Sequence, residues 1–149
     1  MSENKVYSFE LFPPRTTQAE ENLRAARREL AIKNPSFFSC TYGAGGSTRE
    51  HTQNTVLEIK NNGQNVAPHI SFSGDDKSLV DQLLSTYMEA GINRLVALRG
   101  DMLSGMGGMS GMMYANELVT YIREKTGDFF HIDVAAYPEI HPQTNGFLQ

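Results

Sequence analysis

One carboxylate stands inside an apolar run close to the N-terminus, a setting in which a side chain could do acid–base chemistry. Glu10 lies between Phe9 and Leu11 in the stretch YSFELFPPR, which also contains a proline pair. A carboxyl that apolar neighbours partly shield from water is more easily kept protonated, and a protonated carboxyl can serve as a general acid. Glu10 is therefore a candidate catalytic acid, with an ordinary exposed strand residue as the alternative.

Similar runs along the chain place a polar or aromatic residue two positions after a small one. The pairs are Ser8 and Glu10, Ser39 and Thr41, Ala67 and His69, Ala97 and Arg99, and Ala135 and Tyr137. Because strand side chains alternate with a period of two, each pair would lie on one face, with the functional group nearer the carboxyl end. The intervening residues would face helices: Phe9, Cys40, Leu98 and Ala136. The pattern predicts that five strands deliver these groups to one rim.

The elements that position these residues alternate between strand and helix patterns. We expect strands over 6–12, 37–42, 66–72, 93–99 and 130–137. We expect helices over 17–32, 47–63, 75–90 and 113–126. Apolar strands that alternate with helices call for a parallel sheet covered by helices.

Local signals predict the ends and the buried faces of the helices. Capping boxes are expected at Thr17 with Glu20 and at Ser47 with Glu50, and closing glycines at Gly91 and Gly127. The apolar stripe of the first helix is expected at Ala19, Leu23, Ala26 and Leu30, and that of the fourth at Tyr114, Leu118 and Tyr121.

Two architectures fit this order of elements. An open doubly wound sheet can be completed with five strands, whereas an eight-stranded barrel needs roughly 250 residues. The length of 149 residues favours the open sheet. The shared rim favours the barrel, in which catalytic residues come from the ends of several strands.

The bulk composition is that of one soluble domain with a small-molecule partner. Its net charge of -4 gives no reason to expect nucleic acid or an anionic membrane. No apolar run approaches the roughly 20 residues of a membrane span. The one cysteine, Cys40, cannot form an intrachain disulfide, which suits the cytoplasm. No cysteine accompanies a histidine at metal-binding spacing, so no metal site is expected.

Two glycine-rich stretches approach nucleotide-binding motifs without matching them. TYGAGGSTR (41–49) lacks the Gly-Lys-Ser/Thr ending of a P-loop, and GMGGMSG (105–111) misses the G-x-G-x-x-G spacing by one. Neither predicts a nucleotide fold by itself. As an anion loop, TYGAGGSTR would support an alternative function, a barrel enzyme that binds a phosphorylated small molecule.

Five blocks at the ends of the five expected strands resemble methylenetetrahydrofolate reductase of the bacterial type. They are FELFPPR (9–15), TYGAGGSTR (41–49), APHIS (67–71), VALRGD (96–101) and AAYPEIHP (135–142). The resemblance implies an eight-stranded (β/α)8 TIM barrel, and it favours the barrel over the open sheet. It also implies FAD at the carboxyl-end face and ping-pong hydride transfer from NADH or NADPH to methylenetetrahydrofolate, a step in methionine supply.

The same resemblance implies a set of site residues. Cofactor contacts are expected at Thr41, His69, Arg99, Gly100, Asp101, Tyr114, Ala115, Ala135, Tyr137 and His141. Glu10 is implied as the acid that protonates N10 of the folate, which opens the five-membered ring to an iminium ion that accepts hydride. Asp101 is implied to bind the folate, and its negative charge would disfavour the anionic reduced flavin.

Compared with such a barrel, the chain covers the first five β/α units, as one partial FAD-binding domain over residues 1–149. The three other units would carry residues that contact folate. The isolated chain is therefore expected to expose sheet edges and an apolar face, and to associate with itself. The family resemblance also suggests a homo-oligomer. An inactive truncated barrel is the second alternative function.

Overall fold

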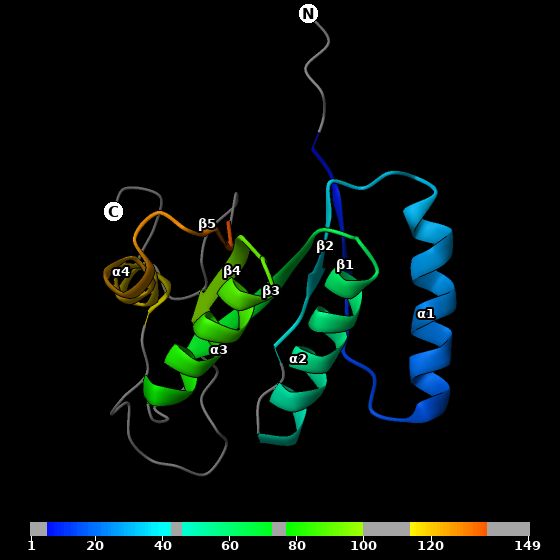
Figure 1. Ribbon diagram of the computed structural model, residues 1–149, viewed down its shortest axis with the longest axis horizontal. Helices are drawn as coiled ribbons and strands as arrows, with labels where there is room; N and C mark the ends of the chain where they lie inside the picture. The colour runs from blue at the N-terminus through cyan, green and yellow to red at the C-terminus, as the bar shows by residue number, and fades with distance from the viewer. Residues whose placement is uncertain (1–5, 43–45, 73–76, 100–113, 137–149) are drawn as a thin grey trace, which may run out of the picture.

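The computed structural model describes residues 6–42, 46–72, 77–99 and 114–136, which form alternating strands and helices (Figure 1). The strands are β1 (Ser8–Leu11), β2 (Phe37–Cys40), β3 (Val66–Phe72), β4 (Arg94–Arg99) and β5 (His131–Val134). The helices are α1 (Thr17–Ala31), α2 (Gly46–Asn61), α3 (Lys77–Glu89) and α4 (Ala115–Thr126). The predicted alternation of five strands and four helices is confirmed.

The strands form one parallel sheet in the order in which they occur along the chain, β1-β2-β3-β4-β5. A doubly wound sheet instead reverses its order at a switch point and carries helices on both faces. Right-handed crossovers that always step in the same direction place every helix on one face. Figure 1 shows α2 and α3 in front of the strands, with α1 and α4 at the two flanks. The open doubly wound sheet that the length favoured is therefore wrong for the described residues.

The core lies between the sheet and this helix layer. Strand residues that point toward the helices are fully buried, among them Cys40, Ile70 and Leu95. They belong to one cluster with Ile59 of α2 and Leu118 of α4. Each fully buried Leu or Ile side chain contributes about 1.5–3 kcal/mol relative to an exposed one. This packing leaves the opposite face of the sheet available for a site. Within the described residues, no helix is both long and apolar enough to cross a membrane.

The helix ends follow local signals, with small shifts from the predicted caps. Thr16, not Thr17, caps α1, because its hydroxyl oxygen accepts a hydrogen bond from the Ala19 N–H at 3.2 Å. α2 begins at Gly46, so Ser47 lies in its first turn and not at the cap. Gly91 and Gly127 have φ of 69° and 57°, the left-handed region that glycine adopts at helix ends, as predicted.

In both α1 and α4, one residue of the predicted buried stripe is exposed and one residue outside that stripe is buried. In α1, Ala26 is exposed and Arg27 is buried. In α4, Leu118 and Ile122 are buried, whereas Tyr114 lies at the N-cap and is 48% exposed. Hydropathy patterns predict that arginine lies at the surface. Arg27 can be buried because its guanidinium pairs with the Glu58 carboxylate of α2.

Strand pairing determines which residues share the face opposite the helices. Partners in a parallel sheet point the same way, and Glu10 pairs with Ser39, which pairs with Ala67. His69 pairs with Val96, and Val96 with Asp133. The predicted face of β1, β2 and β3 is therefore confirmed.

The predicted face of β4 is wrong by one residue. Val96 and Leu98 line the cavity on the face opposite the helices. Ala97 is fully buried on the helix side, and Arg99 shares that side through its pairing with Phe72. The pattern of a small residue followed by a polar one predicted the wrong face because aliphatic residues such as Val and Leu also fill the interior of β/α barrels.

Candidate active site

An open cavity of about 500 Å³ runs along the sheet face opposite the helices. Its lining includes Glu10, Ser39, Thr41, His69, Asp133 and Ala135. Cavities of this size are typical of small-molecule and cofactor sites. All five strands supply side chains to one cavity, as the period-two pattern predicts, except that β4 supplies Val96 and Leu98 instead of Arg99.

Glu10 and His69 approach each other in this cavity. The Nε2 atom of His69 lies 3.6 Å from Oε2 of Glu10, although β2 separates their strands. Ser39 and Ala67 occupy the intervening positions on the same face, and their small side chains leave room for the two longer ones. Burial lowers the pKa of His69, and the Glu10 carboxyl opposes that shift without cancelling it. His69 is therefore expected to be neutral near pH 7.

The described residues do not supply the apolar shielding expected around Glu10. Its side chain is 52% exposed. Phe9 points to the other face of the strand and contacts Phe38 of the core, and Phe12 is 71% exposed. In the described part of the chain, the Glu10 carboxyl lies near the side chain of His69 and not among the expected apolar side chains.

Thr41 is held at the carboxyl end of β2 by two backbone contacts. Its N–H donates to the Leu11 carbonyl at 3.0 Å. Its own carbonyl accepts a hydrogen bond at 3.0 Å from the hydroxyl of Thr52, a fully buried residue of α2. Thr52 could not be predicted from the sequence, because its partner is a backbone atom on another element.

Arg99 and Tyr114 meet on the helix side of the sheet. The Arg99 guanidinium carbon lies 4.6 Å from the centre of the Tyr114 ring. The Tyr114 N–H donates to the Glu117 carboxylate at 2.7 Å and so begins α4, whose first residue is Ala115. Arg99 therefore lies beside the start of α4 and not beside Glu10 in the cavity.

The other predicted site residues divide into two groups. Ala135 lines the cavity, as expected. Gly100, Asp101, Tyr137 and His141 lie outside the described residues.

Asp133 is a charged residue of the cavity that the sequence prediction missed. Its carboxylate lies 3.1 Å from Nη1 of Arg94 and 3.1 Å from Nε2 of His131. The Arg94 guanidinium also lies over the Phe37 ring, 4.4 Å from its centre. A signal was present, because Asp133 stands two places before Ala135 and so shares its face. Arg94 and His131 begin their strands, so this cluster lies toward the amino ends, where barrel residues mostly serve stability.

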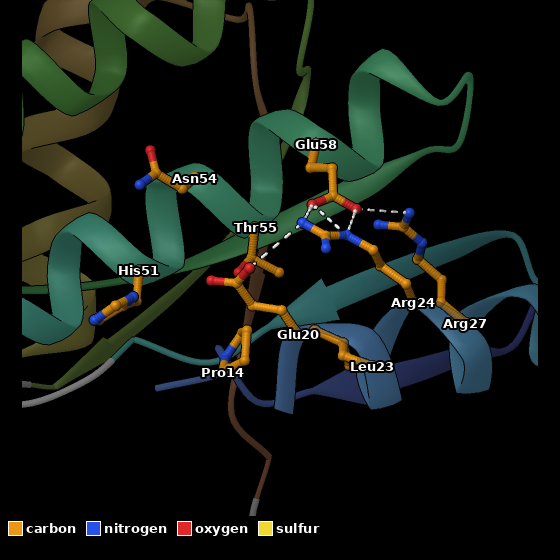
Figure 2. Close-up of a pocket in the computed structure, with 9 residues that line it drawn as sticks. All are labelled: Pro14, Glu20, Leu23, Arg24, Arg27, His51, Asn54, Thr55 and Glu58. Atoms are coloured by element: carbon orange, nitrogen blue, oxygen red, sulfur yellow. Dashed lines mark hydrogen bonds and ion pairs between the residues drawn. The ribbon is translucent and has the colours of Figure 1, made fainter. Parts of the chain in front are cut away.

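A smaller cavity of about 90 Å³ lies between α1 and α2, in the helix layer. Figure 2 shows the side chains of Arg24 and Arg27 directed at Glu58, with Glu20 nearby. The Glu58 carboxylate accepts hydrogen bonds at 2.9 Å from Arg24 and at 3.0 Å from Arg27. The charged groups of this cluster are hydrogen-bonded to one another, so the cluster links α1 to α2. Among the described residues, no three His, Cys, Asp or Glu side chains are grouped to hold a metal ion.

Comparison with known proteins decides the family. Residues 1–149 match the family model described as methylenetetrahydrofolate reductase. This chain belongs to that family. The 5,10-methylenetetrahydrofolate reductase of Pectobacterium carotovorum is 42% identical over 137 residues, which cover 91% of this chain and 45% of that protein. Methylenetetrahydrofolate reductase 2 of Schizosaccharomyces pombe is 40% identical over 148 residues, which cover 95% and 23%. The maize protein named methylenetetrahydrofolate reductase (NADH) 1 is 39% identical over 146 residues, which cover 92% and 24%.

Family membership and sheet order together confirm the predicted fold class. The chain is an α/β protein of a β/α-barrel family, and its described residues form five strands of such a barrel in sequential order. It spans less than half the length of these relatives. A match over the whole chain to this family favours a reductase over an unrelated barrel enzyme that binds a phosphorylated substrate.

Proposed function

We propose that the protein carrying this chain reduces 5,10-methylenetetrahydrofolate to 5-methyltetrahydrofolate with NADH or NADPH, through bound FAD, in the cytoplasm. The observation that carries the proposal is the placement of Glu10 at the cavity, 3.6 Å from His69. Family membership supplies the reaction class. The cavity supplies an acid within reach of a ligand that lies against the open face of the sheet.

The lining of the cavity supports the proposed flavin. Thr41, His69 and Ala135 line it, and Ser39 is small enough to leave a shallow floor against which a flat ring can lie. Arg99 lies outside the cavity, on the helix side of the sheet beside the start of α4, and is proposed to contact FAD there. FAD, when bound, would take hydride from the reduced nicotinamide and then deliver it to the folate.

Glu10 would supply the proton that opens the folate ring. An amine nitrogen is a poor leaving group as an anion, so N10 must be protonated as its bond to the bridging carbon breaks. The exposed carboxyl of Glu10 can reach a substrate held over the cavity and can regain its proton from water between turnovers. Asp101 is proposed to bind the folate and to tune the flavin, and Gly100, Tyr114, Ala115, Tyr137 and His141 to contact FAD.

Substitution of Glu10 by Gln tests this assignment. Reduction of the flavin by NADH should proceed at the wild-type rate, whereas hydride transfer to methylenetetrahydrofolate should slow by about 10²–10⁴-fold, the usual contribution of a general acid. Anaerobic stopped-flow absorbance measures the two half-reactions separately. Glu29→Gln, an exposed carboxylate on α1, is the control and should change neither rate. Loss of both half-reactions in Glu10→Gln would assign Glu10 a structural role, and loss of neither would point to another acid.

A further inference from the structure

A buried histidine, His69, lies beside the proposed acid Glu10. We propose that His69 is a positioning residue for Glu10: its Nε2–H donates to Oε2 of the carboxyl, which leaves Oε1 to carry the proton toward the substrate. The inference rests on the proposed function and deepens it. It gives the histidine a role in the acid step in addition to its proposed contact with FAD.

The two partners differ in how firmly they are held. The His69 side chain is 9% exposed, on a strand with neighbours on both sides, whereas the Glu10 side chain is 52% exposed on the edge strand β1. The imidazole is therefore fixed and the carboxyl adjustable. Their separation of 3.6 Å exceeds a hydrogen bond. A small rotation of the exposed side chain closes it, and catalytic hydrogen bonds commonly tighten when substrate binds.

The protonation of His69 suits a donor that stays in place throughout the reaction. Because burial lowers its pKa, the ring is neutral near pH 7 and carries one N–H. That N–H can bond the carbonyl oxygen of the protonated acid. After Oε1 gives its proton to the folate nitrogen, the same N–H bonds a carboxylate oxygen, and the bond becomes charge-assisted. The contact is stronger after proton transfer than before it, so it favours the transition state.

Glu10 is the carboxylate that faces His69 within the described cavity. Asp133, the other acid in the lining, is already paired with Arg94 and His131. Ser39 and Ala67 leave the path between His69 and Glu10 free of larger side chains. The register of three strands therefore creates this pair.

A double-mutant cycle separates this role from a purely structural one. Flavin-loaded His69→Leu should slow hydride transfer to folate by about tenfold to hundredfold, the effect of losing a charge-assisted hydrogen bond. His69→Gln, whose amide can donate from nearly the same place, should recover most of that rate. In the Glu10→Gln background, His69→Leu should cost nothing further. An equal loss in both backgrounds, or His69→Gln as slow as His69→Leu, would overturn the proposal.

A second measurement needs neither flavin nor turnover. Nitrogen NMR of the imidazole, followed through a pH titration of the flavin-free protein, reports the pKa of His69. Glu10→Gln should lower the pKa of His69 further, because it removes the opposing negative charge. Asp133→Asn should leave the pKa of His69 unchanged. An unchanged value in Glu10→Gln contradicts the pairing. If Glu10→Gln shifts the His69 pKa but the wild type transfers no hydride, the proposed function alone is contradicted. If the wild type transfers hydride but Glu10→Gln leaves the His69 pKa unchanged, the positioning role alone is contradicted.

Discussion

At the scale of single residues, the cavity depends on small side chains as much as on functional ones. Glu10 was predictable as a candidate because an acid in an apolar strand is unusual, and period two put it on the correct face. Its contact with His69 was not predictable. That contact depends on the register of three strands and on the small side chains of Ser39 and Ala67. The register of paired strands cannot be read from a single sequence.

Tyr87 offers a residue-scale test of the core. It is fully buried on α3, and its hydroxyl has no hydrogen-bond partner among the described residues. An unpaired buried hydroxyl costs about 1–3 kcal/mol, so Tyr87→Phe should be neutral or should stabilise the fold by about 1 kcal/mol. Tyr121→Phe is the matched control, because its hydroxyl donates to Asp81 at 2.7 Å, and it should destabilise. Urea denaturation compares them, and a clear loss in Tyr87→Phe would mean that its hydroxyl is paired.

Cys40 should be chemically inert in the folded protein. It is fully buried, and burial raises the pKa of its thiol to about 12. The reactive species is the thiolate, so the thiol should not react with a disulfide reagent at pH 8 until the protein unfolds. Reaction is followed by the released chromophore, with and without denaturant. Rapid modification of the native protein would contradict this burial.

At the scale of elements, local signals were predicted well and distant partners were not. The closing glycines of α3 and α4 were correct because the left-handed backbone is a local requirement. The burial of Arg27 was missed because its partner, Glu58, lies on the next helix. The face of β4 was misassigned because Leu98 and Arg99 are both acceptable at the end of a barrel strand.

The tie between α1 and α2 predicts a pH dependence of stability. Arg24 and Arg27 hold the pKa of Glu58 below its ordinary value of 4.5. A lowered folded pKa means that the stabilisation is complete above the unfolded value and is lost as the pH falls through the folded one. Glu58→Gln should therefore cost about 1–2 kcal/mol at pH 7, less than a fully buried pair because Glu58 is 34% exposed.

The difference between wild type and Glu58→Gln should shrink as the pH falls below 4.5. Denaturant midpoints at several pH values measure it. Glu89→Gln, an exposed residue of α3, is the control and should show a negligible difference at every pH. A constant penalty across the whole range would mean that Glu58 acts through packing and not through its charge.

At the scale of the whole molecule, the strand order distinguishes a β/α barrel from the open sheet that the chain length favoured. A count of residues favours an open sheet, whereas in the described residues sequential pairing places all four helices on one face and none on the other. The strand order could not be read from the sequence, because both architectures share the same alternation of elements. The family resemblance supplied the correct choice through five blocks at the strand ends.

The sheet face that no described helix covers and the two edge strands predict self-association of the 149-residue chain. Among the described residues, β1 and β5 are the two edge strands of the sheet, and Val134 of β5 is 55% exposed. Edges of this kind pair with other chains unless a charge blocks them. Light scattering should show oligomers whose size grows with concentration, and Val134→Lys should reduce them. A monomer at high concentration, with a cooperative melt, would contradict the prediction.

The most direct test of the whole account is the visible absorbance of the purified protein through three successive additions under anaerobic conditions. After FAD is added and the excess removed, the protein should remain yellow. NADH or NADPH should bleach the flavin band, and methylenetetrahydrofolate should then restore it. A protein that stays colourless after reconstitution with FAD would contradict the account.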